Sequence, residues 1–207
     1  MKTYIYGKPD AQIVLIQPVD DHDLDGIENE VAYITQNCDT GFCLIAAKID
    51  DWNVQLSPWE APAVFGNEAF GSGAADTLKS ILEICDDESK KYYLGGYSLA
   101  GLFALWAVCQ TDVFCGAAAA SPSVWFPDFT NYIKENDIKT DAVYLSLGDR
   151  EEKTKNPIMA TVGDRIRETY GLLQKKGVNC TLEWNSGNHF KEPDTRMAKA
   201  FSWLLKM

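Results

Sequence analysis

Residues 92–110 read YYLGGYSLAGLFALWAVCQ, and this stretch decides the fold. Its first part, Tyr92 to Gly96, is short and rich in residues that favour a buried strand. Its last part, Leu99 to Gln110, is apolar nearly all round, which is typical of a buried helix. Ser98 stands at the junction. A serine in a tight turn from strand to helix predicts a nucleophile whose hydroxyl is lifted above the edge of a sheet.

The neighbours of Ser98 suit such a turn. Gly96 and Ala100 are small, which the turn requires because the strand and the helix pass close together. The usual pattern has glycine on both sides, so Ala100 departs from it by one methyl group. The backbone N–H of Leu99 would point at a developing oxyanion from the start of the helix. The alternative interpretation is a glycine-rich turn in which Ser98 only caps the helix.

Strand-like and helix-like segments alternate along the rest of the chain. This alternation predicts an α/β fold in a single domain over residues 1–207, with a mostly parallel sheet and helices on both faces. Ligands bind at the carboxyl ends of the strands in such sheets. The segment between Ser121 and Ala142 is too short for a large lid domain, so we expect an open, shallow site. We expect strands at 11–17, 42–49, 92–96, 115–121, 142–147 and 178–184, and helices that include 27–37, 74–85, 99–110 and 194–206.

The base that a nucleophilic serine needs is expected at His189. In folds with this kind of turn, the acid and then the histidine follow the serine along the chain, and His189 is the one histidine after Ser98. It lies just past the last predicted strand, at the edge of the sheet where the serine is expected. The other histidine, His22, follows the first buried strand, and we expect it to be a solvated loop residue.

The acid that orients the histidine should follow the strand 142–147. A carboxylate there would accept a hydrogen bond from the imidazole and stabilise its charged form. The spacing from Gly148 favours Glu151, with Asp149 second and Glu152 third. The alternative interpretation of this segment is a solvated acidic turn.

Four segments read GYSLAGLFA (96–104), SPSVWF (121–126), LGDRE (147–151) and GNHF (187–190). Together they resemble an esterase family of the α/β-hydrolase superfamily, which includes esterase D-like enzymes, enterochelin and ferric-siderophore esterases, and feruloyl esterases. The resemblance spans residues 92–207, whereas residues 1–91 match only in general layout. The chain departs from the family at Ala100, and it is shorter than many members and lacks a large insertion.

The resemblance implies an α/β-hydrolase fold and a serine carboxylesterase that works through an acyl-enzyme. Carried onto this sequence, Ser98 attacks the ester, His189 moves the proton, and Glu151 or Asp149 orients the histidine. Two further interpretations stay open. The chain could be an acyltransferase that uses the same three groups, or a non-catalytic binding module that has kept the fold.

The loop after the first buried strand should supply a second donor to the oxyanion, from the backbone N–H of Val19 or Asp20. Residues 20–25 are expected to form an acidic loop there, and no HGGG-type motif is present. Each such donor is typically worth about 3 kcal/mol of the barrier, so its absence would make the enzyme slow.

Aromatic residues near the predicted site are candidates for substrate contacts. We expect Trp125 and Phe126 to border the pocket, with Trp52 and Tyr97 as further candidates. Such a pocket would favour small aryl or sugar esters. The alternative is that these rings fill a loop-covered edge of the core.

The formal net charge of −11 argues against nucleic-acid and membrane-surface partners, because an acidic surface repels phosphate groups. No secretory signal stands at the start, so we expect a cytoplasmic protein. We expect no cofactor or metal, and a small-molecule ester as the partner. The sequence leaves open whether the chain forms a homo-oligomer.

Overall fold

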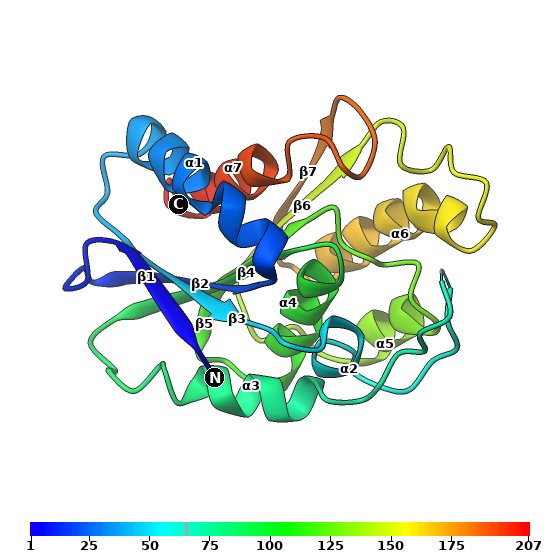
Figure 1. Cartoon of the computed structure of the whole chain (residues 1–207), viewed down its shortest axis with the longest axis horizontal. Helices are drawn as coiled ribbons and strands as arrows, with labels where there is room; N and C mark the ends of the chain where they lie inside the picture. The colour runs from blue at the N-terminus through cyan, green and yellow to red at the C-terminus, as the bar shows by residue number, and fades with distance from the viewer. Residues whose placement is uncertain (65) are drawn as a thin grey trace.

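The computed structural model describes residues 1–64 and 66–207. Within them the strands form one seven-stranded sheet in the order β1-β3-β2-β4-β5-β6-β7. Strand β1 is antiparallel to β3, and all the other neighbours are parallel (Figure 1). The fold is therefore the mostly parallel α/β sheet that the sequence predicts. The strands are β1 (Thr3–Gly7), β2 (Ile13–Val19), β3 (Cys43–Lys48), β4 (Lys91–Tyr97), β5 (Phe114–Ala120), β6 (Ala142–Gly148) and β7 (Asn179–Asn185).

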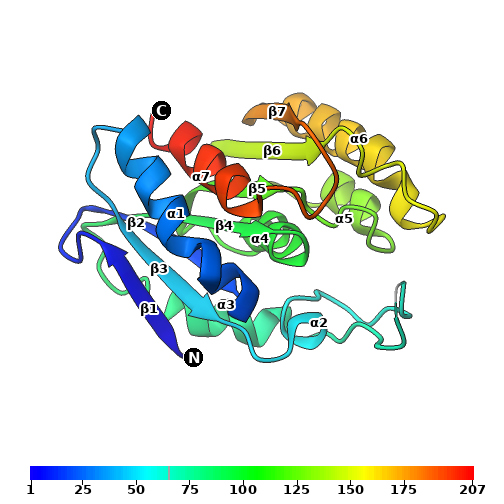
Figure 2. The same ribbon diagram turned by 45° about the horizontal axis from the view of Figure 1, so that its top comes forward.

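Helices cover both faces of the sheet. Two of them, α1 and α7, lie side by side on one face (Figures 1 and 2). A buried apolar cluster that includes Ile27, Tyr144 and Phe201 joins them to the sheet. A larger cluster fills the opposite face, around α4. The helices are α1 (Asp21–Asn37), α2 (Trp52–Gln55), α3 (Ala74–Leu82), α4 (Leu99–Gln110), α5 (Phe129–Glu135), α6 (Val162–Lys175) and α7 (Pro193–Leu204), with a 3₁₀ turn at Met159–Thr161.

The segment quoted first lies at the centre of this architecture. Strand β4 pairs with β2 on one side and β5 on the other, so it is a central strand. Helix α4 is buried from Leu99 to Cys109, which explains why its sequence is apolar on every side. A serine between these two elements is held on both sides by the core.

Three local predictions were wrong. The acidic residues 20–25 are not a loop, because α1 begins at Asp21 rather than Ile27. Asp20 caps the helix: its side chain accepts the N–H of Asp23, and the Asp23 carboxylate accepts the N–H of Asp20. The helical start was hidden because aspartates are typical of loops as well as of helix N-termini.

The other two corrections concern strands. Strand β1 was not predicted, and it adds an antiparallel edge beside β3. Strand β2 continues past Pro18 to Val19, although proline lacks an N–H for the ladder. Its pairing with β4 stops at Ile16, so one side of β2 no longer has a strand partner at Pro18.

Within residues 1–64 and 66–207, no helix combines the length and the apolar composition that crossing a bilayer requires.

Candidate active site

Ser98 occupies the turn between β4 and α4. Its backbone has φ 56° and ψ −120°, a conformation that residues with a side chain rarely adopt. The small neighbours make the turn possible: a Cβ added to Gly96 would lie 2.4 Å from the carbonyl carbon of Ala100. Only glycine fits at position 96, whereas the extra methyl group of Ala100 is accommodated. The predicted junction of strand, serine and helix is therefore present.

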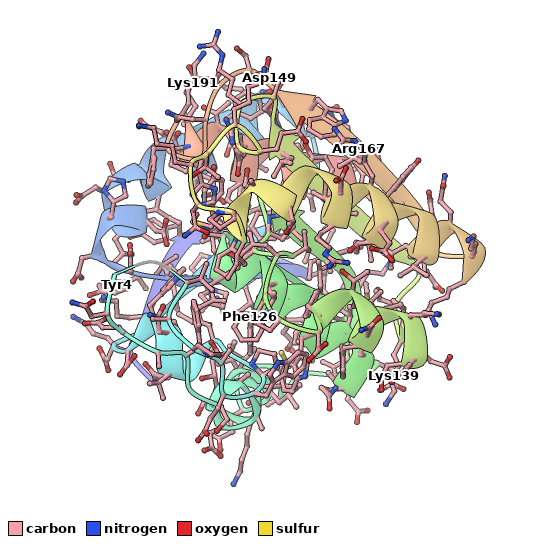
Figure 3. All side chains as sticks on the ribbon, turned by 90° about the vertical axis from the view of Figure 1, so that its right-hand side faces the viewer. Tyr4, Phe126, Lys139, Asp149, Arg167 and Lys191 are labelled. Atoms are coloured by element: carbon pink, nitrogen blue, oxygen red, sulfur yellow. The ribbon has the colours of Figure 1, made fainter. Side chains whose placement is uncertain are left out.

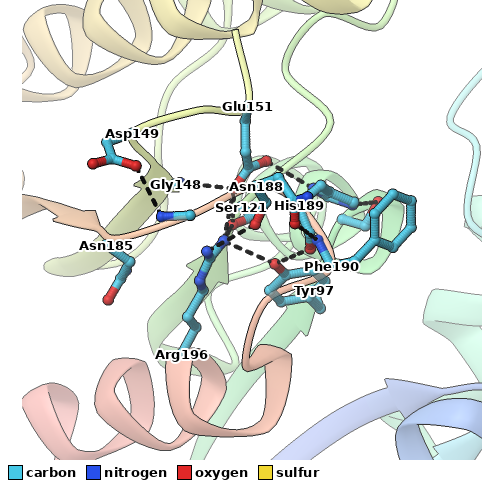
Figure 4. A network of polar contacts seen from close by, with 12 residues as sticks. Tyr97, Ser121, Gly148, Asp149, Glu151, Asn185, Asn188, His189, Phe190 and Arg196 are labelled. Carbon is cyan, nitrogen blue, oxygen red and sulfur yellow. Dashed lines mark hydrogen bonds and ion pairs between the residues drawn. The ribbon is translucent and has the colours of Figure 1, made fainter. Parts of the chain in front are cut away.

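His189 lies on the loop between β7 and α7, and it connects Ser98 to a carboxylate. Its Nε2 lies 3.0 Å from the Oγ of Ser98, and its Nδ1 lies 2.7 Å from Oε2 of Glu151 (Figure 4). The hydroxyl of Tyr97 donates to the backbone carbonyl of His189 over 2.6 Å. If Nδ1–H donates to Glu151, Nε2 is left to accept the Ser98 hydroxyl proton, which is the tautomer a general base requires.

Glu151 is buried, and each of its carboxylate oxygens has partners. Besides the bond to His189 through Oε2, Oε1 accepts the N–H of Gly148 and the hydroxyl of Ser121, each over 2.7 Å. Burial alone would raise the pKa of this carboxyl. The hydrogen bond and the charge attraction of His189, with the bonds from Ser121 and Gly148, outweigh burial and hold the pKa below its usual value. The carboxylate therefore stays ionised beside the imidazole.

The other two candidate acids point elsewhere. Asp149 accepts the backbone N–H of Gly187 over 2.8 Å and so ties the acid loop to the histidine loop. Glu152 pairs with Arg167 at 3.2 Å. Figure 3 shows Asp149 and Lys191, which belong to these two loops, at the same end of the molecule. Of the three carboxylates after β6, the structure brings Glu151 to the imidazole.

Sequence reasoning missed Arg196, a buried residue in α7. Its guanidinium donates to Oε1 of Glu151 over 2.7 Å and to the hydroxyls of Tyr97 and Ser121 over 3.0 Å each (Figure 4). Its other terminal nitrogen donates to the carbonyl of Asn188 over 2.9 Å. One side chain therefore holds both the acid and the loop that carries the histidine. A charged residue buried this deeply is unusual unless it is paired.

The first oxyanion donor that was predicted, the N–H of Leu99, lies in the opening turn of α4. Helical N–H groups in that turn have no acceptor within the helix, so they suit a developing anion. Val19 is the last residue of β2 and lies in register with Lys48. The N–H of Asp20 already donates to Asp23 over 3.2 Å. The second donor, from Val19 or Asp20, therefore stays a prediction.

Ser98 and His189 open into a small cavity of about 170 Å³. Trp52, Tyr97 and Phe190 contribute its aromatic lining, so two of the four aromatic residues predicted for the pocket line it. Asp20, His22 and Asp23 contribute its polar lining. Burial raises the pKa of Asp23 to about 6, and the charge of Asp20 adds to the effect. His22, which was expected in a loop, lies in α1 and lines the cavity.

Trp125 and Phe126 do not line this cavity, which corrects the prediction for both. Phe126 is only 2% exposed and packs against Trp59 and Phe70, with ring centroids 5.7 and 5.1 Å apart. Trp125 packs against Phe70 at 6.0 Å. Both line a separate cavity of about 310 Å³ beside α5. The alternative interpretation of these two rings, as filling of a loop-covered edge, describes them better.

The order of elements and residues defines a class of protein. A serine in the turn after a central parallel strand, a carboxylate after β6 and a histidine after β7 together characterise the α/β-hydrolase fold. Chain order alone would not identify it, but here the three side chains also meet at one edge of the sheet.

Comparison with solved structures gives the same fold. An IroE-like serine hydrolase from Shewanella oneidensis superposes with a TM-score of 0.78 at 15% identity, over 99% of this chain and 75% of that one. The siderophore hydrolase EstA from Aspergillus nidulans gives 0.64 at 19% identity, over 97% and 85%. Acyl-protein thioesterase 2 from Zea mays gives 0.57 at 15%, over 99% of both chains. No protein-family model and no curated protein sequence matches the chain. The chain thus has the α/β-hydrolase fold, and its described residues form no large lid.

Proposed function

We propose that the chain is a serine hydrolase that cleaves carboxylic esters of small molecules through an acyl-enzyme. The observation that carries this proposal is the continuous chain of hydrogen bonds from Ser98 through His189 to Glu151, with distances of 3.0 and 2.7 Å. The similarity to structures described as serine hydrolases and siderophore hydrolases supports the same chemistry. A turn serving only to cap a helix would need neither the strained backbone of Ser98 nor the imidazole.

In the first half of the reaction, Oγ of Ser98 attacks the ester carbonyl carbon while Nε2 of His189 takes the hydroxyl proton. The carbonyl oxygen becomes an oxyanion, which the N–H of Leu99 stabilises at the start of α4. When the intermediate collapses, the bond to the alkoxy oxygen breaks and His189 gives its proton to the departing alcohol. The acyl group then remains on Ser98 as an ester.

In the second half, water attacks the acyl carbon while His189 takes one of its protons. Collapse releases the carboxylic acid, and the proton returns to Oγ of Ser98. Glu151 stays ionised throughout and stabilises the imidazolium, as its lowered pKa allows. Arg196 and Ser121 hold Glu151 in place, so it needs no reorganisation during the cycle.

Hydrolysis of p-nitrophenyl acetate by wild type and Ser98→Ala tests the proposal. We expect the substitution to lower kcat by at least about 10⁴-fold. Ser123→Ala is the matched control, because the Oγ of Ser123 lies only 3.3 Å from the Oγ of Ser98. The Nε2 of His189 is paired with Ser98. The control should lose less than about tenfold, since it leaves the nucleophile and base in place. Full turnover by Ser98→Ala would refute the proposal.

Added alcohol separates hydrolysis from acyl transfer. If the acyl-enzyme reacts mainly with water, methanol or glycerol at moderate concentration should leave carboxylic acid as the main product. Predominant formation of a new ester would identify the chain as an acyltransferase with the same nucleophile. If the folded wild-type protein does not turn over the substrate, the chain would be a binding module.

A further inference from the structure

A second, larger cavity lies next to the one that contains Ser98. Its volume is about 390 Å³, and it shares His22, Asp23, Phe190 and Pro193 with the smaller cavity. Its lining comes mainly from α1, α7 and the loop before α7, and the two helices run side by side (Figure 2). The two helices approach closely at Gly26, where an added Cβ would lie 3.2 Å from the Cβ of Asp194. A substrate bound at Ser98 could therefore extend into this second cavity past Phe190.

The second cavity is strongly acidic. Five carboxylates line it, from both helices and the loop before α7, and no lysine or arginine is among its lining residues in the described part of the chain. Among the described residues of this lining, His22 supplies the one basic side chain. Carboxylates gathered without counter-charges repel one another, which costs stability unless a ligand supplies the positive charge. The five are Asp23, Asp25, Glu30, Glu192 and Asp194.

Two buried oxygen atoms in the lining lack hydrogen-bond donors. Gln17 and Glu30 are each only 2% exposed, and Nε2 of Gln17 donates to Oε2 of Glu30 over 3.3 Å. The other oxygens of the pair, Oε1 of Gln17 and Oε1 of Glu30, have no hydrogen-bond partner among residues 1–64 and 66–207. A buried acceptor without a donor typically costs about 1–3 kcal/mol. The pair therefore presents two acceptors at the wall of an acidic cavity.

Electrostatics at Glu30 points the same way. Burial raises the pKa of its carboxyl well above the usual value, and the charges of Asp23 and Asp194 raise it further, while the bond from Gln17 opposes the rise. A positive group among these carboxylates would offset the repulsion that Asp23 and Asp194 exert on Glu30. It would also donate hydrogen bonds to the acceptors that lack them.

The arrangement fits an organic cation better than a metal ion. No cluster of three or more His, Cys, Asp or Glu side chains in the described residues is close enough to hold a metal. The carboxylates are instead spread around a cavity large enough for a group with several N–H donors. Phe190, which is 85% exposed and lines both cavities, offers an aromatic face that attracts a cation.

We propose that the cavity between α1 and α7 is a subsite for a cationic nitrogen group of the substrate, a primary ammonium or a guanidinium. This inference rests on the proposed ester hydrolysis, since it names the class of ester. The substrate would place its carbonyl at Ser98 and extend its positive end past Phe190 to Glu30 and Asp194. Esters with a positive end would then be preferred over neutral esters of the same length.

A pair of matched substrates tests this subsite. In p-nitrophenyl 6-aminohexanoate and p-nitrophenyl heptanoate, an ammonium group replaces a methyl group at the end of an otherwise equal acyl chain. We expect wild type to prefer the amine by at least about tenfold in kcat/KM, which corresponds to about 1.4 kcal/mol. Glu30→Gln should abolish most of this preference, because the amide, unlike the carboxyl, cannot ionise beside a bound cation. Asp194→Asn gives a second test if Glu30→Gln does not fold.

The control variant is Glu28→Gln, which removes the same charge from an exposed position of α1 outside the cavity. It should keep the preference, which shows that the effect is local and not due to the overall charge of −11. If heptanoate is hydrolysed in a Ser98-dependent way but the amine is not preferred, the subsite is refuted while the proposed function stands. The same holds if Glu30→Gln and Asp194→Asn both keep the preference, in which case Glu30 is only a protonated partner of Gln17. If neither ester is hydrolysed while p-nitrophenyl acetate is, the subsite is refuted and the proposed function stands; if none of the three is hydrolysed, both proposals fail.

Discussion

Asp23→Asn should stabilise the protein at neutral pH, because Asp23 is held at the site in an unfavourable charged form. Burial and the neighbouring charge of Asp20 raise the pKa of Asp23 from 3.8 to about 6 in the folded protein. A carboxyl with a raised pKa costs no stability below pH 3.8, and the cost grows as pH rises through about 6. The difference between these pKa values corresponds to about 3 kcal/mol at pH 7.5 and above.

The net gain is smaller than this value because Asp23 also has a favourable role. Its carboxylate accepts the N–H of Asp20 over 3.2 Å at the start of α1. Asparagine keeps an oxygen acceptor for that bond but loses the attraction between a negative charge and the helix N-terminus, worth about 0.5 kcal/mol. We therefore expect Asp23→Asn to raise the free energy of unfolding by about 2.5 kcal/mol at pH 7.5. For a chain of this size that raises Tm by about 6 °C.

Urea denaturation at pH 7.5 and pH 4 would measure the effect. At pH 4 the folded protein already holds Asp23 largely protonated, so wild type and variant should differ by less than about 1 kcal/mol. Glu28→Gln, an exposed change on the same helix outside the acidic cavity, is the control and should shift stability little at either pH. An equal gain at both pH values, or no gain at pH 7.5, would refute the assigned burial of Asp23.

Three further substitutions test the turn, the acid and its support. Gly96→Ala should lower stability by about 3 kcal/mol or more because its Cβ would overlap the backbone of Ala100, whereas Gly171→Ala, in open space on α6, should raise Tm slightly. Glu151→Gln should lower kcat by about 10³-fold or more, and Asp149→Asn by less than about tenfold. Arg196→Met should cost about 4 kcal/mol in urea denaturation, since it leaves Glu151 buried without its guanidinium partner. Equal effects within either matched pair, or an unchanged Arg196→Met protein, would contradict the geometry.

The central architecture could be predicted because its signals are local in the sequence. A strand that runs into GYSLAG and then into a helix apolar on all sides permits few arrangements, and β4 and α4 are found there. His189 followed from chain order, since it is the one histidine after Ser98. Glu151 was preferred among three carboxylates by spacing alone, and only the structure places it against the imidazole.

Other features depend on contacts between distant segments, which single-sequence patterns do not contain. Trp125 follows a strand at the correct edge of the sheet, but its ring turns toward Phe70 instead of the Ser98 cavity. Arg196 was not among the predicted site residues. A signal was present in the helical spacing. Arg196 lies four and eight residues before Ala200 and Leu204, which are both buried, so it shares their face of α7. Its partners, on β4 and on the loops after β5, β6 and β7, could not be read from the sequence.

Labelling with a fluorophosphonate probe, followed by mass mapping of the modified peptide, tests most directly whether Ser98 is an activated nucleophile. We expect one adduct, on Ser98, and its loss in Ser98→Ala. His189→Ala should be labelled at least about 100-fold more slowly, because the hydroxyl then lacks its base. A folded wild-type protein that stays unlabelled, or one labelled on another serine such as Ser123, would contradict the account.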